Sequence, residues 1–349
     1  MWKPNSLYND LYRLTVLYNK ETDLKKKNEL SEVIYYVEKT LNDMVCEDKP
    51  RLFTEGLYSK CTSSIPRFKP YIQYVYDFLF ESNKYVDNIT PRLYTSADYT
   101  AKDMYELADA FYKSIGGKTY EAYQRINKEK AHRLNFTQLT CNDSTTYYIP
   151  ILDKYYINLG VTDGKDEDVI EAYIHEVGHV ITARKNNYRY FSEDILTEIE
   201  TYFYEILADR YLLKLTNDEY FDYLEKDKMI RFNCRADLFA RINNAYNRVL
   251  KDVLKVDNHE EVMEKYTHEE GIEEIENYNI EVIMVYVLSY MFAIELASIY
   301  EKDKDKALYL LDKIIENRKD ISEYEKIMTN IEPNKHLKRY VKELKKVKE

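Results

Sequence analysis

Two histidines four residues apart, with a glutamate directly after the first, are the residues of this chain whose types and spacing could do chemistry. They lie in the segment His175-Glu176-Val177-Gly178-His179. On an α-helix, positions i and i+4 lie on the same face, so both imidazoles can bind one metal ion. Glu176 is then close enough to take a proton from a metal-activated water, as in metallopeptidases with the His-Glu-x-x-His motif. The motif therefore predicts a Zn²⁺ centre that hydrolyses peptide bonds.

A catalytic zinc ion needs a third protein ligand and an open position for water. Residues 196–213 form a strong helical pattern that contains Glu198 and Glu205, seven residues apart and therefore on one face. Glu200 points away from this face and is expected to be a surface charge. Glu205 and Asp209 have the spacing Glu-x-x-x-Asp, in which the first residue binds metal and the second orients a ligating histidine. The pattern alone leaves both Glu198 and Glu205 open as the third ligand.

The elements that position these residues are predicted to be mainly α-helical. Only seven glycines and seven prolines occur in 349 residues, which favours long uninterrupted helices. Short β-prone runs within residues 145–159 predict a hairpin just before the histidine helix, and nearly everything after that helix is predicted to be helical. The helices predicted before the hairpin are two within residues 5–45, one at 71–80, and two at about 100–115 and 119–130.

The helical pattern breaks between residues 83 and 95, where Asn88, Thr90 and Pro91 favour a turn. This break predicts an N-terminal helical region at residues 1–90 and a catalytic domain at residues 91–349.

Composition and charge narrow the class of protein. The formal net charge of −11 speaks against nucleic acid or an anionic membrane surface as the main partner. The four cysteines are scattered and the N-terminus has no signal-peptide pattern, which predicts a cytoplasmic protein. The longest apolar stretch, residues 282–294, is too short to span a bilayer and predicts a buried helix.

The chain resembles the oligoendopeptidase F and thimet oligopeptidase family of zinc peptidases in two segments. The family motif His-Glu-x-Gly-His is matched by residues 175–179, including Gly178. Residues 197–213 match, without a gap, the sequence pattern of the helix that comes after this motif in the family. The matching positions in that helix are Glu198, Thr201, Phe203, Glu205, Leu207, Tyr211, Leu212 and Leu213.

The resemblance implies a helical, zincin-type metallopeptidase fold of the gluzincin kind, with a small β-hairpin or sheet beside the active-site helix. It implies Zn²⁺ bound by His175, His179 and Glu198, with Glu176 as general base and oligopeptides as substrates. Glu205 falls on the family's second acidic position, where a supporting role near the metal site is implied. The chain is shorter than a typical family member.

A further match lies at residues 285–290, which resemble the end of a family segment rich in His and Tyr that stabilises the tetrahedral intermediate. Tyr286 and Tyr290 stand in tyrosine positions, and Asn279 stands roughly where the family has its His. The resemblance therefore implies that Tyr286 or Tyr290 donates a hydrogen bond to the oxyanion. The alternative is that both tyrosines only line a buried helix.

Two alternatives to the complete interpretation stay open. In the first, Glu205 is the zinc ligand and Asp209 its partner, as in thermolysin-like peptidases. In the second, the chain is a non-catalytic helical protein that keeps the metal motif and binds peptides or a partner.

Overall fold

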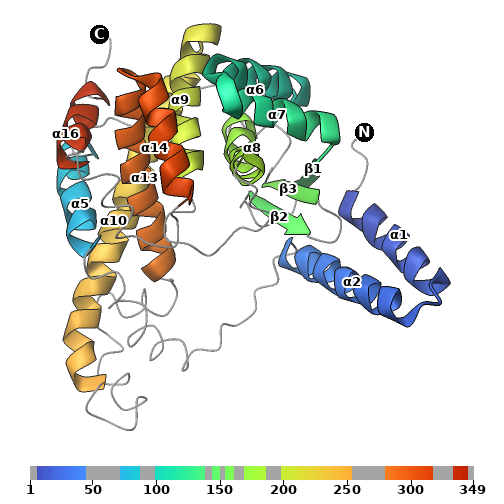
Figure 1. Cartoon of the computed structure of the whole chain (residues 1–349). Coiled ribbons are helices and arrows are strands. Elements are labelled where there is room, and N and C mark those ends of the chain that lie inside the picture. Colours follow the sequence, from blue (N-terminus) through green and yellow to red (C-terminus); the bar gives the residue numbers. More distant parts are fainter. Residues whose placement is uncertain are drawn as a thin grey trace. The chain divides into compact units, whose positions relative to one another are not determined.

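The structure is a computed structural model, and most of the residues that it describes are helical (Figure 1). The chain forms two compact units. The first unit comprises Met1–Asp48, Thr95–Glu193 and Leu207–Tyr220, and the second comprises Lys49–Tyr94, Asp194–Ile206 and Phe221–Glu349. The described residues are 6–44, 71–86, 99–137, 144–149, 154–160, 169–185, 198–253, 280–316 and 333–344.

The two units do not coincide with the predicted regions 1–90 and 91–349, because each unit takes segments from both. The physical reason lies in α5 (Ile72–Val86), whose buried face packs against helices from the end of the chain. Phe78 on α5 contacts Tyr290 on α13 (Ile280–Tyr300), with ring centroids 6.1 Å apart.

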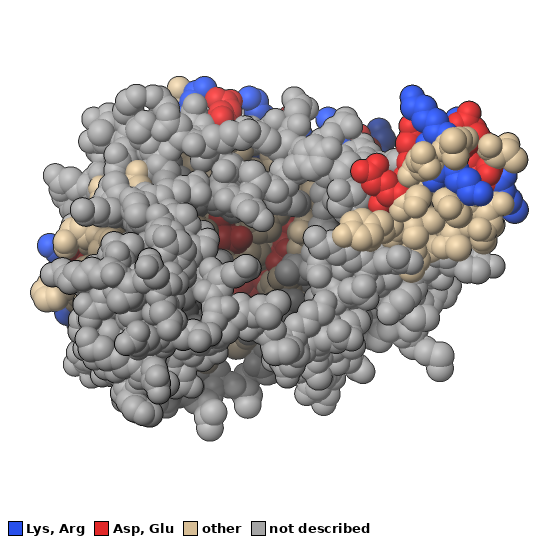
Figure 2. All heavy atoms as spheres, turned by 90° about the horizontal axis from the view of Figure 1, so that it is seen from below, with Lys and Arg blue, Asp and Glu red and all other residues tan. Residues whose placement is uncertain are grey.

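In the first unit, α1 (Ser6–Lys20) and α2 (Leu24–Met44) confirm the two helices predicted within residues 5–45. Their exposed side chains carry both signs of charge, as Figure 2 shows on the right. The exposed basic residues are Arg13, Lys20, Lys25 and Lys26, and the exposed acidic residues are Asp23, Glu29 and Glu32. The side chains of these two helices that the structure describes therefore present a surface of mixed charge.

Helices α6 (Ala101–Ile115) and α7 (Gly117–Glu129) follow the predicted ranges closely. A capping box begins α6, because the Thr100 side chain accepts from the backbone N–H of Asp103 while the Asp103 carboxylate accepts from that of Thr100. Gly116 and Gly117 have φ values of 66° and 52°, a region that side chains with a Cβ rarely adopt. The two glycines therefore make the sharp change of direction between the helices.

A three-stranded sheet lies in the first unit, in the order β1-β3-β2. Strand β2 (Thr145–Ile149) runs antiparallel to β3 (Lys154–Gly160), and β1 (His132–Thr137) runs parallel to β3. The sequence pattern predicts strand structure only for the β2 and β3 segments, so β1 is a strand that the pattern does not reveal. β1 was missed because the run His-Arg-Leu-Asn-Phe-Thr has few residues of high β-propensity, and its pairing with β3 supplies the stabilisation.

Helix α8 (Val169–Lys185) carries the histidine motif and is buried on nearly all sides. It packs against α6, α7, β2 and β3. The Tyr112 hydroxyl on α6 donates to the carbonyl of Ile174 at 2.8 Å, directly before the first histidine. Tyr112 also stacks on Tyr123 of α7, with ring centroids 4.8 Å apart. The abundant tyrosines thus form part of the core that fixes α8.

The second unit contains α10 (Tyr220–Val253), α14 (Lys304–Glu316) and α16 (Pro333–Leu344) in addition to α5 and α13. Helix α13 packs against α5, α14 and α16. The apolar part of α13 is longer than the predicted stretch 282–294, since Ile283–Tyr300 is long and apolar enough to cross a membrane by length and composition. However, 83% of this window is buried inside the protein, as in a core helix, and one such helix is weak evidence for a membrane span.

Glu295 is a charged residue type within this apolar helix and is completely buried. Its Oε1 lies 3.4 Å from Nδ1 of His336 on α16. Burial raises the pKa of the Glu295 carboxyl from 4.5 to about 8. Between pH 4.5 and about pH 8, the Glu295 carboxyl is therefore protonated in the folded protein and ionised in the unfolded chain.

Because the folded pKa is higher, stability should fall as pH rises from about 4.5 to about 8. Glu295→Gln keeps the shape and has no charge to bury. We expect the variant to lack this pH dependence and to be more stable than wild type at pH 7 by roughly 3 kcal/mol. Urea unfolding of both proteins at pH 5 and pH 7.5 checks this. An identical pH dependence in the two proteins would contradict it.

Candidate metal centre

His175 and His179 lie one turn apart on α8 and face the same way, with ring centroids 5.0 Å apart. His179 is buried, whereas His175 is partly exposed. Their spacing follows from the helix geometry alone. The helix itself is held by the tyrosine contacts of α6 and α7, so the histidine pair has a fixed backbone beneath it.

Glu198 stands at the start of α9 (Ile199–Thr216). Its carbonyl accepts the backbone N–H of Tyr202 at 3.1 Å, which is the first turn of the helix. The Thr201 hydroxyl lies 3.2 Å from Oε2 of Glu198 and 3.0 Å from its carbonyl oxygen. A carboxylate is favoured at this end because the helix dipole is positive there. The local sequence thus stabilises a carboxylate at this position.

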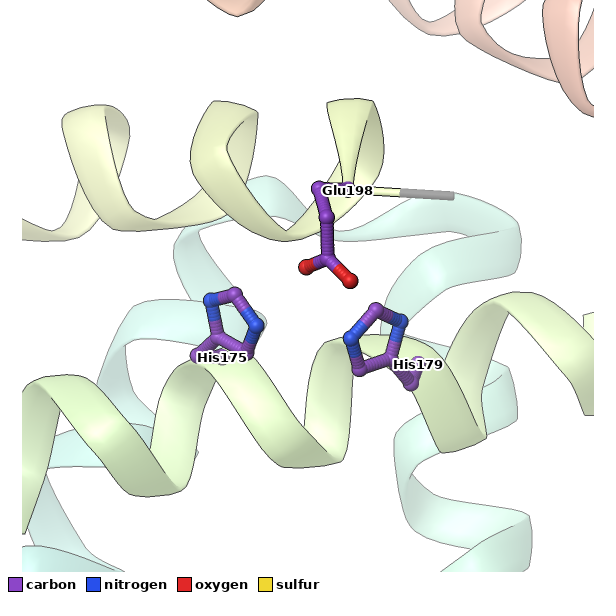
Figure 3. A group of neighbouring side chains, drawn as sticks. All are labelled: His175, His179 and Glu198. Carbon is purple, nitrogen blue, oxygen red and sulfur yellow. The ribbon is translucent and has the colours of Figure 1, made fainter. Parts of the chain in front are cut away.

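The side chains of His175, His179 and Glu198 point toward one another (Figure 3), and their potential ligand atoms all lie within 4.8 Å. A tetrahedral zinc ion with bonds of about 2.0–2.1 Å separates its ligand atoms by about 3.4 Å. Small side-chain rotations suffice to reach that spacing. Two imidazoles and one carboxylate are also a donor set of catalytic zinc sites. These residues therefore fit a zinc ion.

Glu205 has a different surrounding. Its Oε2 lies 3.3 Å from Nζ of Lys228 on α10, and the two side chains are only 8% and 1% exposed. A buried charge of this kind needs an opposite charge beside it. Among the described residues, the ligand atoms that lie together are those of His175, His179 and Glu198, and Glu205 is not part of this group. Asp209 is also buried.

Glu200 is 1% exposed, so the expectation that it is a surface charge is wrong. The expectation assumed that α9 has a solvated face opposite the metal site. Instead, α9 is buried on nearly all sides from Ile199 to Ala208, which leaves no such face.

Glu176 is also buried, and its carboxylate has a partner in the sheet. The Thr146 hydroxyl on β2 lies 2.5 Å from Oε2 of Glu176 and 3.2 Å from its carbonyl oxygen. The proposed general base is therefore held from a strand thirty residues earlier in the chain.

The two tyrosines of α13 lie in different environments. Tyr290 is completely buried, stacks on Phe232 with ring centroids 4.0 Å apart, and its hydroxyl lies 3.3 Å from that of Tyr340. This environment favours the packing interpretation for Tyr290. Tyr286 is only partly buried. Both rings lie near Tyr202, one turn after Glu198, with centroid distances of 6.3 Å for Tyr286 and 6.0 Å for Tyr290. Asn279 lies outside the described residues.

Three residues near these side chains were missed from the sequence. They are Thr146, which contacts Glu176, Lys228, which pairs with Glu205, and Arg235. The guanidinium of Arg235 lies 4.7 Å from the ring centroid of Tyr286. No motif signals any of them, because each contact joins segments at least twenty residues apart. For Lys228 alone there is a weak signal, because a lysine on the buried face of a helix indicates an acidic partner.

Searches of protein-family models and of curated proteins give no match for this chain. Its fold is nevertheless similar to solved peptidase structures. An X-ray structure of a protein assigned as an oligoendopeptidase F has a TM-score of 0.53 at 11% identity, over 93% of this chain and 66% of that one. PZ peptidase A, in complex with an inhibitor, has a TM-score of 0.52 at 12% identity, over 85% of this chain and 58% of that one.

The chain thus has the fold of these peptidases and spans about two thirds or less of their length. At such low identity the likeness concerns the fold alone. The two structures agree with the mainly helical architecture that the resemblance in the sequence implied.

Zinc content distinguishes the two candidate third ligands. Glu198→Ala should lose almost all bound zinc, because one of three protein ligands is removed. Glu205→Ala should keep zinc but lose about 3–5 kcal/mol of stability, because the buried Lys228 is left without its carboxylate. Metal analysis and urea unfolding of both purified variants measure this.

The double variant Glu205→Leu/Lys228→Met is the control, since it removes both buried charges together. It should recover most of the lost stability and retain zinc. Loss of zinc from Glu205→Ala with retention in Glu198→Ala would reverse the assignment.

Proposed function

We propose that this protein is a zinc-dependent peptidase that hydrolyses peptide bonds in oligopeptides. The observation that supports this most strongly is the convergence of His175, His179 and Glu198, whose ligand atoms lie within 4.8 Å of one another. The peptidase fold of the similar structures is consistent with it.

In the proposed reaction, His175, His179 and Glu198 would hold Zn²⁺. When bound, the ion would polarise the scissile carbonyl and make the attacking water more acidic. Glu176 accepts a proton from this water at one carboxylate oxygen and passes it to the leaving amine. The burial of Glu176 limits competing contacts with solvent. Tyr286 donates a hydrogen bond to the oxyanion.

Strand β2 offers a way to bind the peptide. It lies at the edge of the sheet, so only one of its sides pairs with a described strand. An extended peptide can add to such an edge through backbone hydrogen bonds, which give affinity without requiring one sequence. The contact of Thr146 with Glu176 connects this strand to the proposed general base.

We propose oligopeptides as the partners, with neither nucleic acid nor a membrane involved, and a cytoplasmic location. The net charge of −11 and the scattered cysteines support this. Cys234 on α10 is a free cysteine.

Loss of the general base should abolish hydrolysis without loss of the metal. Glu176→Gln keeps the size of the side chain but cannot accept the proton. We expect zinc content to equal that of wild type and cleavage of a quenched-peptide library to fall by about two to four orders of magnitude. Wild-type cleavage should also stop with a chelator and return with zinc.

The second candidate, a protein that binds peptides without turnover, predicts a different result. Wild type would then show no chelator-sensitive cleavage across the library, yet would still bind peptides. The departure at Asn279 from the family pattern is the observation that favours this candidate. Full activity of purified Glu176→Gln would also overturn the proposed mechanism.

Tyr286→Phe and Tyr290→Phe form a matched pair that separates an oxyanion role from a packing role. We expect Tyr286→Phe to lower kcat about 10²-fold with little change in KM, because the hydrogen bond forms mainly in the transition state. Tyr290→Phe should leave kcat nearly unchanged and affect only stability, since its hydroxyl faces Tyr340. Steady-state kinetics and thermal unfolding of both variants test this. A kcat of Tyr286→Phe equal to that of wild type would remove Tyr286 from the mechanism.

A further inference from the structure

We infer that Thr146 is a positioning residue for the general base: its hydroxyl on β2 holds one oxygen of the Glu176 carboxylate so that the other meets the attacking water. This inference rests on the proposed peptidase function. It depends on a contact within the first unit, between a strand and a helix that pack directly on each other.

The register of the sheet explains why Thr146 faces α8. Thr146 pairs with Ile157 on the antiparallel neighbour β3, and paired residues point to the same face of a sheet. On β3, this face carries Tyr155 and Ile157, both completely buried. The guanidinium of Arg184 on α8 lies 5.5 Å from the ring centroid of Tyr155. The face that holds Thr146 is therefore the face that covers α8.

The hydroxyl has a single proton and two acceptors of Glu176 within reach. The carboxylate Oε2 lies 2.5 Å away and the main-chain carbonyl oxygen 3.2 Å away. The carbonyl already accepts a bond within the helix, and a charged acceptor forms the shorter and stronger hydrogen bond. The proton therefore goes to Oε2. In the proposed mechanism the remaining oxygen, Oε1, takes the proton of the water.

A glutamate side chain has three rotatable bonds, so a correctly placed Cα does not orient its carboxylate. The packing of α8 fixes the backbone of Glu176, and the bond from Thr146 selects one orientation of its carboxylate. Because β2 is also the proposed peptide-binding strand, the element that aligns the substrate would align the base. Loss of the hydroxyl should therefore slow the chemical step and leave peptide binding to the strand unchanged.

Thr146→Val removes the hydroxyl but keeps the shape and the β-propensity of the side chain. We expect kcat to fall about ten- to a hundredfold, with KM and zinc content unchanged. Thr146→Ser restores the hydroxyl and should recover most of kcat. In the Glu176→Gln background, Thr146→Val should have almost no further effect, because the two residues act as one unit.

Thr119→Val on α7 is the matched control. Thr119 is also a buried threonine of the first unit, and its hydroxyl has no hydrogen-bond partner among the described residues. The same chemical change there should leave kcat and KM at wild-type values.

The outcomes separate the inference from the function on which it rests. A wild-type protein without chelator-sensitive cleavage would overturn both. An active wild type together with a fully active Thr146→Val would overturn the inference alone. A Thr146→Val variant with a higher KM and an unchanged kcat would also overturn the inference, because Thr146 would then be a binding residue. Failure of Thr146→Ser to recover activity would overturn it as well.

Discussion

The burial of α8 on nearly all sides is the constraint on which the candidate centre depends. A helix carrying two histidines and a glutamate has polar side chains to place, yet almost every position of α8 faces other parts of the protein. The Tyr112 hydroxyl satisfies a second lone pair on the Ile174 carbonyl, and Tyr105 packs edge-on against Tyr173 with ring centroids 5.3 Å apart. Tyrosine suits this task because it buries a large ring and still provides a polar group. The histidine spacing becomes a defined geometry only because these contacts hold the helix.

Charge decides which acidic residue of α9 is available to a metal. Glu198 and Glu205 lie on one face, and either could bind a divalent cation if it had no other partner. Lys228 neutralises Glu205 in a buried pair, so moving that carboxylate to a metal would leave a lysine charge in the core. Glu198 stands directly before the helix, where the Thr201 hydroxyl and the positive end of the helix dipole lie beside its carboxylate. The proposal that Glu198 is the third ligand is therefore supported by a residue on α10, outside the motif.

The sequence predicted what depends on local spacing. The helix pair α6 and α7, the break at Gly116 and Gly117, and the shared face of His175 and His179 all follow from residues close in the chain. It did not predict β1, the burial of Glu200, or the contacts of Thr146 and Lys228. Each of these depends on partners twenty or more residues away, and periodicity carries no information about them. The burial of Glu200 illustrates this, since a helix buried on all sides has no solvated face to predict.

Because identity to the similar structures is low, the function must be argued from the side chains of this chain and not from the shared fold. A shared fold at 11–12% identity fixes where a helix and a strand lie, and leaves open which side chains stand on them. The chemistry then rests on a few residues of this chain whose contacts can be checked one by one. Glu176 is an instructive case, because the His-Glu-x-x-His pattern fixes only its place on α8. Its carboxylate direction is set by Thr146, which belongs to a strand that the pattern does not include. A chain with the motif but without a donor at that strand position would keep the metal ligands and leave the base without this support.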